Sequence, residues 1–324
     1  MPCNKPIKGY LDSTGKFTLK CPENGAQWID IPCGRCIACR LQKASERAIR
    51  CIHEAQMWEE SCFVNLTYSD EYLPEDRNIK WEDMKKFLKR LRKKFPGKVI
   101  RYFGCGEYGG NLINENNVWF WDRKDYRQDR LPKFPRAHYH AIIFNYRPKD
   151  GVVAYINKHG DEVYGSEELN KLWKYGHTSY GDVTVQSCGY VARYITKKQN
   201  SNTKADYVAK YGQPIYDLET AEYICDHPTV PETAHGSSGN TQVEREKELG
   251  AIGATWLKKY WSTDCFNQGF VMGPLPEGKK YSIPRYYWDW LERVYPNEYR
   301  KFKKRKSEKY IQNKDKIEAD NTYD

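Results

Sequence analysis

The segment RAHYHAIIFN (residues 136–145) is the clearest β-strand signal in the chain, and it carries two histidines one residue apart. In a strand, His138 and His140 project from the same face, about 7 Å apart along the chain direction. Two imidazoles on one face can bind one metal ion, although most such H-x-H pairs are surface or hydrogen-bonded histidines. The segment therefore predicts a sheet, and it makes that sheet a candidate metal site.

Predicted strands and helices alternate around this segment. β-Branched and aromatic residues indicate further strands over residues 62–70, 98–109 and 177–185. Apolar residues at helical spacing indicate helices over residues 36–58, 81–95, 166–176 and 186–198. Ser166 is the expected N-cap of the helix over residues 166–176. Residues 109–135 are expected to form a long loop or an extended hairpin. The order predicts an α+β fold, with helices covering one face of a central antiparallel sheet.

The composition is basic and rich in aromatic residues, with a net charge of +10, 26 Tyr and 10 Trp. Positive charge attracts polyanions and aromatic rings stack on bases, so the combination is typical of nucleic-acid-binding proteins. No segment reaches the roughly 18 apolar residues of a membrane span. The N-terminus has no apolar stretch like that of a secretion signal, so we expect neither secretion nor a membrane partner.

The predicted helix over residues 81–95 is unusually basic. Between Lys80 and Arg101, ten Lys and Arg residues stand against two acidic residues. Most charged helix faces are simply solvated, but this excess suggests contact with phosphates. The expected DNA-binding residues of this helix are Lys89, Arg92 and Lys93.

Glu107, at the end of the strand that precedes the histidines, is the best candidate for a third metal ligand. Two neutral imidazoles and one carboxylate leave coordination positions open. That arrangement suits Mg²⁺ or Mn²⁺ acting on a phosphate oxygen. The alternative for Glu107 is an exposed turn residue.

Two tyrosines lie four residues apart in the basic segment CGYVARYITKK (residues 188–198). On a helix, Tyr190 and Tyr194 would share one face, with Cβ atoms about 5–6 Å apart. A phenol, with a pKa near 10, is a competent nucleophile only beside a metal and other cations. Arg193 and the lysines at 197 and 198 supply positive charge. The alternative is that Tyr190 packs in the core and Tyr194 lies at the surface.

The motifs NLTY, GEYG, HYH and YVARYITKK occur in this order within residues 65–198. With PCGRCIAC and the helix after it, they resemble the rolling-circle replication initiators of the HUH endonuclease superfamily. Among these, the chain is most similar to the initiators of microviruses of the gokushovirus type. The resemblance covers roughly residues 30–200. Two later segments, GAIG (residues 250–253) and IPRYY (residues 283–287), resemble the same family more weakly.

The resemblance implies a ferredoxin- or RRM-like HUH domain that nicks and joins single-stranded DNA at a phage origin. His138, His140 and Glu107 would hold Mg²⁺ or Mn²⁺. Tyr190 and Tyr194 would be the nucleophiles, forming a 5′-phosphotyrosine intermediate. The family pattern has a lysine between the tyrosines where this chain has arginine, so the catalytic cation would be Lys197, with Arg193 and Lys198 contacting DNA.

The same resemblance carries expectations about partners and place of action. The DNA partner would be single-stranded or supercoiled viral origin DNA. The sequence has no nucleotide-binding P-loop, so unwinding would come from a host helicase within the host replication machinery. The place of action would be the bacterial host cytoplasm. Two alternative functions are also consistent with part of these patterns. One is a non-catalytic single-stranded nucleic-acid-binding protein, and the other is a plasmid relaxase or transposase with the same chemistry.

Several of the chain's eleven cysteines lie close together near the N-terminus. The spacing Cys33-x₂-Cys36 is usual for half of a zinc site, and Cys3 and Cys21 precede it. We expect Cys3, Cys21, Cys33 and Cys36 to bind one structural Zn²⁺, with Cys39 as a substitute ligand. The alternative is a set of reduced structural cysteines at the start of a helix.

Together these patterns predict three regions. Residues 1–58 form a Cys-rich segment and helix, and residues 59–199 form the HUH catalytic domain. Residues 200–324 form a C-terminal region with a flexible linker at about 225–248 and a basic tail.

Overall fold

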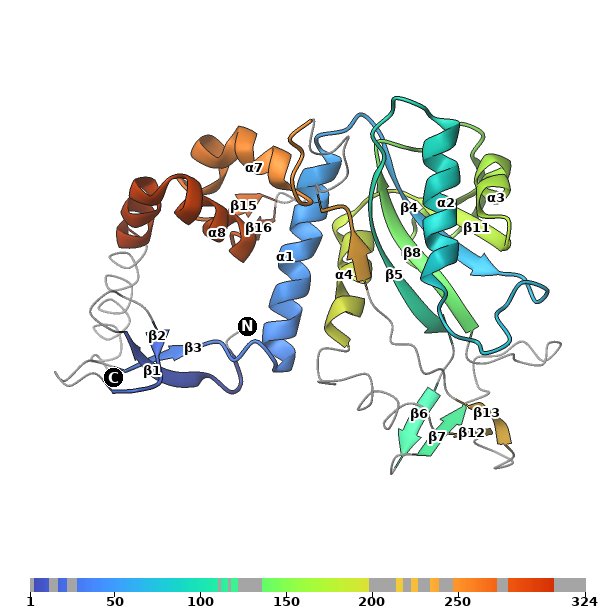
Figure 1. Ribbon diagram of the computed structural model, residues 1–324, viewed down its shortest axis with the longest axis horizontal. Helices are drawn as coiled ribbons and strands as arrows, with labels where there is room; N and C mark the ends of the chain where they lie inside the picture. The colour runs from blue at the N-terminus through green and yellow to red at the C-terminus, as the bar shows by residue number, and fades with distance from the viewer. Residues whose placement is uncertain are drawn as a thin grey trace.

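The computed structural model describes residues 3–11, 17–21, 28–109, 112–115, 118–121, 136–197, 214–217, 223–226, 234–238, 247–272 and 279–305. Within them, a large antiparallel sheet lies between two layers of helices, and a C-terminal helical unit packs beyond one layer (Figure 1). This arrangement confirms the α+β fold. Among the described residues, no helix combines the length and apolar character needed to cross a lipid bilayer.

The central sheet has seven strands in the order β14-β5-β8-β4-β11-β10-β9, and each neighbouring pair is antiparallel. Its strands are β4 Ser61–Tyr68, β5 Arg101–Gly109, β8 Arg136–Phe144, β9 Val152–Ile156, β10 Glu162–Gly165, β11 Gly176–Gly181 and β14 Ala234–Gly236. β4, β5, β8 and β11 are the strands expected from the sequence. β9 and β10 form a hairpin that the sequence analysis did not anticipate.

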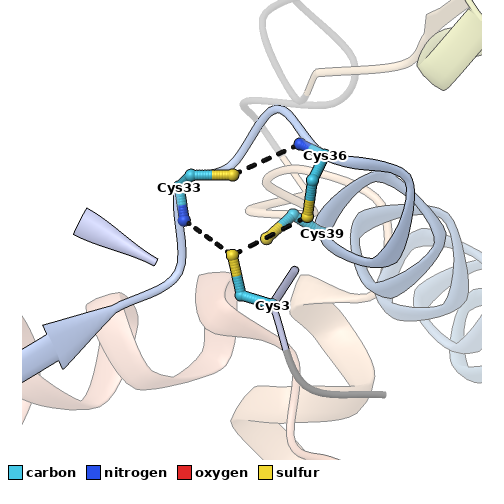
Figure 2. Close-up of side chains that lie close together, drawn as sticks. All are labelled: Cys3, Cys33, Cys36 and Cys39. Atoms are coloured by element: carbon cyan, nitrogen blue, oxygen red, sulfur yellow. Dashed lines mark hydrogen bonds between the residues drawn. The ribbon is translucent and has the colours of Figure 1, made fainter. Parts of the chain in front are cut away.

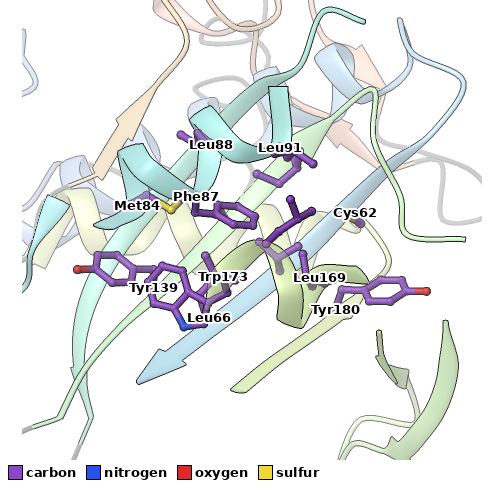
Figure 3. Packing of buried hydrophobic residues seen from close by; sticks show 14 of the residues in the cluster. Cys62, Leu66, Met84, Phe87, Leu88, Leu91, Tyr139, Leu169, Trp173 and Tyr180 are labelled. Atoms are coloured by element: carbon purple, nitrogen blue, oxygen red, sulfur yellow. The ribbon is translucent and has the colours of Figure 1, made fainter. Parts of the chain in front are cut away.

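Helices α2 (Trp81–Lys94) and α3 (Glu167–Trp173) cover one face of the sheet. Apolar residues spaced three and four apart place one side of α2 in this core, as Phe87 illustrates (Figure 3). Opposite α2, Tyr139 of β8 and Trp173 of α3 are fully buried. The side-chain oxygen of Ser166 accepts a hydrogen bond from the backbone N–H of Leu169 at 3.0 Å, which confirms the predicted N-cap.

Helices α4 (Val185–Lys197) and α1 (Ile37–Ala55) cover the opposite face. Cys188 and Val191 of α4 pack with Phe103 and Ile142 of the sheet and with Ala48 of α1. The expectation of helices on one face alone was therefore wrong. An apolar stripe shows which side of a helix is buried, but it does not show which face of a sheet buries it.

The C-terminal unit packs on the far side of α1 (Figure 1). It consists of α7 Ala254–Tyr260, the π-helix η2 Trp261–Cys265, β15 Val271–Met272, β16 Lys280–Tyr281 and α8 Arg285–Val294. Its core joins Trp256, Leu257 and Leu291 to Ile49 of α1. Helix α1 thus contributes to two hydrophobic cores, one on each side of it.

A buried ion pair joins the sheet, α1 and the C-terminal unit. Arg101 of β5 and Glu54 of α1 are both fully buried, and their Nη1 and Oε1 atoms lie 2.5 Å apart. The other oxygen of Glu54 accepts a hydrogen bond from the N–H of Gly253 at 2.7 Å, and Arg101 Nη2 donates to the carbonyl of Gly250 at 2.5 Å. The GAIG segment thus supplies two of the further partners that a buried charge pair needs, and Nε1 of Trp58 supplies another by donating to Oε1 of Glu54 at 3.1 Å.

Position 253 requires glycine for two reasons. Gly253 has a φ of +80°, and a Cβ there would lie 2.8 Å from Oη of Tyr287. Tyr287 belongs to the IPRYY segment, and its hydroxyl lies 2.8 Å from Nδ1 of the buried His53. The two C-terminal motifs therefore pack against each other and against α1.

Strand β14 (Ala234–Gly236) closes one edge of the central sheet by pairing with β5. This stretch lies in the expected linker at about 225–248, so that expectation was wrong for these residues. The side chain of His235 packs against Trp81, with ring centroids 4.2 Å apart. A strand in a polar stretch rich in Gly and Ser cannot be recognised from the sequence, because strands pair through backbone atoms and need no apolar pattern to do so.

Smaller sheets complete the described structure. The N-terminal sheet contains β1 Ile7–Leu11, β2 Phe17–Thr18 and β3 Trp28–Ile31. A four-stranded sheet contains β6 Leu112–Glu115, β7 Val118–Trp121, β12 Pro214–Asp217 and β13 Tyr223–Asp226. β6 and β7 pair antiparallel, which confirms an extended hairpin in the long connection after β5. Of the predicted basic tail, only residues up to 305 are described, and these are helical.

Candidate active site

Strands β5 and β8 bring the three predicted metal ligands together. In their antiparallel register, Glu107 lies directly opposite His138, and Cys105 lies opposite His140. Because side chains alternate along a strand, the two histidines and Glu107 project from one face. That face is the one covered by α4 and α1.

The three side chains converge on a small volume. Oε2 of Glu107 lies 3.1 Å from Nε2 of His140 and 3.4 Å from Nε2 of His138. All the ligand atoms of this group lie within 4.8 Å of one another, and the three residues are half-buried. The separation is small enough for one cation to contact all three.

Hydrogen bonds to the other ring nitrogens orient both histidines. Nδ1–H of His138 donates to the carbonyl of Arg136 at 3.1 Å, and Nδ1–H of His140 donates to Oδ1 of Asn65 at 2.5 Å. These partners assign the proton to Nδ1, so each Nε2 lone pair faces Glu107. Three electron-rich atoms then point at one another, an arrangement that a bound cation stabilises.

Burial favours the metal-binding form of His140. Removal of its ring from water lowers its pKa, and the neighbouring His138 acts in the same direction, whereas the Glu107 carboxylate, which would accept a hydrogen bond from the protonated ring, opposes the shift. The neutral imidazole is the form that can donate a lone pair to a metal. The residues present therefore suit a divalent cation.

Tyr190 of α4 reaches into the same group. Its hydroxyl donates a hydrogen bond to Oε2 of Glu107 at 2.8 Å and lies 3.5 Å from Nε2 of His140. Its ring packs edge-on against His140 and Phe63. The guanidinium of Arg193 lies 6.0 Å from the centre of the Tyr190 ring. Tyr190 is therefore not simply a core residue, because its hydroxyl lies at the proposed metal ligands.

Two other predicted site residues lie on α4 beyond Tyr190. Tyr194 is one turn further along the helix, and Lys197 is its last residue. Their side chains fall outside the described part of the structure, as does the whole of Lys198.

The predicted DNA-binding residues of α2 lie away from this group. α2 covers the sheet face opposite to the face that carries the histidines. Arg92 donates through Nη2 and Nε to the carbonyl of Ile100 at 3.0 and 3.2 Å, so it stabilises the chain between α2 and β5. Lys89 and Lys93 are exposed on that far side.

A second group of potential ligands lies at the start of α1. The sulfur atoms of Cys3, Cys33, Cys36 and Cys39 lie within 4.8 Å of one another (Figure 2). The N–H of Cys36 donates to Sγ of Cys33 at 3.3 Å, and the N–H of Cys33 donates to Sγ of Cys3 at 3.3 Å. Backbone hydrogen bonds lower the pKa of the Cys36 thiol to about 6. Such bonds favour thiolates, the form in which cysteine binds zinc.

The fourth member of this group differs from the preferred set. Cys39, expected only as a substitute, completes the cluster, and Cys21 is exposed outside it. The spacing Cys33-x₂-Cys36-x₂-Cys39 places the third cysteine in the first turn of α1. There the helix turns its side chain back toward the loop, which linear spacing alone does not reveal.

Comparisons with known proteins decide the family. The family described as replication-associated protein ORF2/G2P matches residues 130–199, which carry both histidines and both tyrosines. The replication-associated protein VP4 of Bdellovibrio phage phiMH2K is 32% identical over 311 residues, covering 93% of this chain and 81% of that protein. This chain belongs to the replication-associated proteins of microviruses.

Two further relatives of this microvirus family are less completely covered. The replication-associated protein ORF4 of Chlamydia phage 1 is 30% identical over 82% of this chain and 54% of its own length. The replication-associated protein ORF2 of Spiroplasma virus 4 is 31% identical over 52% of this chain and 48% of its own length. No solved structure matches the chain.

Asn65, in the NLTY motif, is a site residue that the sequence did not place beside the histidines. In this microvirus protein, its Oδ1 accepts from His140 and its amide donates to Oγ of Ser179 at 3.0 Å. The register of the strands brings it there, because Asn65 of β4 lies opposite His140 of β8. A polar side chain paired across the strands from a metal-binding histidine is a natural second support for that ring.

Replacing Asn65 by alanine should weaken Mn²⁺ binding by about 10- to 100-fold, because His140 loses the acceptor that fixes its orientation. Isothermal titration of Mn²⁺ into the metal-free protein measures the change. Thr178→Ala is the control, since Thr178 lies on the neighbouring strand β11 and its hydroxyl donates to Oδ1 of Asn170 on α3, which covers the opposite face of the sheet. Equal Mn²⁺ affinities for the two variants would show that Asn65 does not position the ligand.

Proposed function

We propose that this chain is a metal-dependent nuclease that nicks and rejoins single-stranded DNA at a phage replication origin. The observation that carries the proposal is the hydrogen bond between Tyr190 Oη and Glu107 Oε2, the same oxygen that faces both histidines. A phenol in direct contact with a candidate metal centre is suited to attack a phosphate held there. Membership of a phage replication family supports the same chemistry.

Each side chain has a defined part in this proposal. A bound Mg²⁺ or Mn²⁺ would polarise the scissile phosphate. Glu107 orients the phenol oxygen of Tyr190 and accepts its hydrogen bond. As the Oη–phosphorus bond forms, the phenol gives its proton to Glu107 and the phosphorus–O3′ bond breaks. The leaving oxygen takes up one proton from the solvent to become a free 3′-hydroxyl, and Glu107 returns its proton to the solvent. The DNA is then attached to the protein through a 5′-phosphotyrosine.

Tyr194, one turn along α4, is the proposed second nucleophile. It would cut the regenerated origin while the first end remains on Tyr190, and the new 3′-hydroxyl would then attack the phosphotyrosine. Each step exchanges one phosphodiester for another, so joining needs no nucleotide cofactor. Arg193, Lys197 and Lys198 are the proposed cations that stabilise the phenolate and contact the backbone of the DNA.

The proposed partners follow from this activity. The substrate is single-stranded or supercoiled viral origin DNA, and a helicase of the host supplies unwinding within its replication machinery. The site of action is the host cytoplasm. The exposed lysines of α2 lie across the sheet from Tyr190, so we propose that they contact DNA away from the nick.

Purified protein with Mn²⁺ or Mg²⁺ should form a covalent adduct with origin-containing single-stranded oligonucleotides tiled from the phage genome. A band shift that survives denaturing electrophoresis detects the adduct. EDTA should abolish it, and added Mn²⁺ should restore it, because the phenol alone is a poor nucleophile at neutral pH. Binding of the same oligonucleotides without any adduct would instead favour a non-catalytic single-strand-binding protein.

We also propose that Cys3, Cys33, Cys36 and Cys39 hold a structural Zn²⁺ at the base of α1. Four sulfur ligands from a turn and a helix start suit a closed tetrahedral site. The purified protein should contain one zinc per chain, measured by mass spectrometry under native conditions. Cys39→Ser should lose that zinc, whereas Cys21→Ser should keep it. Zinc retained in the Cys39 variant would rule out this ligand set.

A further inference from the structure

A pocket of about 560 Å³ opens beside the candidate active site. His140 and Tyr190 line one part of it, and the β9–β10 hairpin and the start of α4 line much of the remainder. Its volume falls in the range of small-ligand pockets, roughly 300–1,000 Å³. Because the wall includes the proposed nucleophile, a group that fills the pocket lies next to the reacting phosphate.

The hairpin side of the pocket is an ordered turn. Oδ1 of Asn157 accepts hydrogen bonds from the backbone N–H groups of His159 and Asp161, at 2.8 and 3.0 Å. The N–H of Asn157 donates to the carbonyl of Asp161 at 2.9 Å. An asparagine side chain that closes its own turn restricts the backbone. The amide of Asn157 also donates to Oδ2 of Asp161 at 3.1 Å, and the hydroxyl of Tyr164 donates to Oε2 of Glu162. One oxygen of each exposed carboxylate is thereby held in place at the pocket wall.

The charges along the wall are mostly negative. Asp161, Glu162 and Asp182 line the pocket, and Arg193 is the guanidinium among the lining residues. Asp182 is paired with Arg147 at 2.7 Å, which leaves the two hairpin carboxylates as the dominant charges. This wall repels a phosphate, but its oxygens accept hydrogen bonds from an amino group.

The remaining wall suits a flat ring. Phe63, Tyr155 and Tyr180 line the pocket, and Tyr155 is 56% exposed. An exposed aromatic ring gives a base a stacking surface. Gln186, near the start of α4, is exposed and lines the same space. Its amide can both donate to and accept from a base edge.

We propose that this pocket takes the base of one of the two nucleotides joined by the scissile phosphate, and that it selects a base with an exocyclic amino group. Adenine, cytosine and guanine carry such a group, and thymine does not. Asp161 and Glu162 accept its hydrogen bonds, while the phosphate stays at Glu107 and Tyr190. The inference rests on the proposed nicking activity and adds a determinant of where the nick falls.

The test uses a library of single-stranded oligonucleotides of random sequence, incubated with the full-length protein and Mn²⁺. Sequencing the strands that become covalently attached, together with the released fragments, gives base preferences around the nick. Thymine should be depleted about tenfold at one of the two flanking positions. In an Asp161→Ala/Glu162→Ala double variant, which removes both acceptors, that depletion should disappear while the preferences at other positions remain.

Glu292→Ala, which removes an exposed carboxylate on α8, is the matched control and should keep the depletion. Equal use of all four bases at both flanking positions by the unaltered protein would overturn the inference and leave the nicking proposal intact. Thymine depletion that persists in the double variant would also overturn the inference and leave the nicking proposal intact. Absence of any adduct with the unaltered protein would overturn the nicking proposal and this inference with it.

Discussion

Replacing Tyr190 by phenylalanine should abolish the first covalent adduct, lowering its rate of formation by more than about a thousandfold. The change removes a single oxygen, the one that donates to Glu107 at 2.8 Å and lies 3.5 Å from His140. The ring itself can keep its packing against Phe63. The measurement is the initial rate of adduct formation in Mn²⁺, followed on denaturing gels.

Tyr194→Phe separates the two nucleophiles in the same assay. Because the hydroxyl of Tyr190 lies at the proposed metal ligands, the Tyr194 variant should still form the first adduct. It should fail to release a joined product from an oligonucleotide that carries two nick sites. If the Tyr190 variant formed the first adduct at the normal rate, the assignment of Tyr190 as the first nucleophile would be wrong.

Glu54→Gln should lower the free energy of unfolding by about 3–5 kcal/mol, because it leaves the buried Arg101 guanidinium without its counter-charge. Both side chains are fully shielded from water, so solvent cannot compensate for the loss. Urea denaturation followed by circular dichroism gives the change. Glu82→Gln, which breaks an exposed pair with Lys85, is the control and should leave stability almost unchanged.

A double substitution separates the cost of an unpaired charge from loss of packing. Glu54→Leu with Arg101→Met removes both charges, so the pair of changes should be much less destabilising than Glu54→Gln alone. A double variant as unstable as the single variant would show that shape or the hydrogen bonds to Gly250 and Gly253 dominate at this position.

The candidate metal ligands could be predicted from the sequence because strand geometry is local. Alternation puts His138 and His140 on one face wherever the strand lies, and a neighbouring strand that ends in Glu107 needs only the right register. The structure supplies that register, with Glu107 opposite His138. The alternation of side chains along a strand therefore identifies the candidate ligands, and the pairing of β5 with β8 brings them together.

The rest of the site depends on contacts that no local pattern encodes. The support from Asn65 arises from pairing between β4 and β8. The hairpin pocket could have been suspected, because VVAYI and EVYG flank the turn-forming segment NKHGD. The sequence could not show that the basic helix α2 lies on the sheet face away from the histidines. Its pattern of charged and apolar residues would be the same whichever face of the sheet it covered.

The order of synthesis gives the buried ion pair a further consequence. A ribosome makes Glu54 and Arg101 well before Gly250 and Gly253, whose backbone groups complete their hydrogen bonds. The edge of strand β5 likewise stays unpaired until the residues of β14 have been synthesised. Until those later residues emerge, the nascent protein holds two charges without their full set of partners and an unpaired strand edge. The strands that carry the candidate active site can therefore reach their final support only after residues 250–253 have emerged from the ribosome.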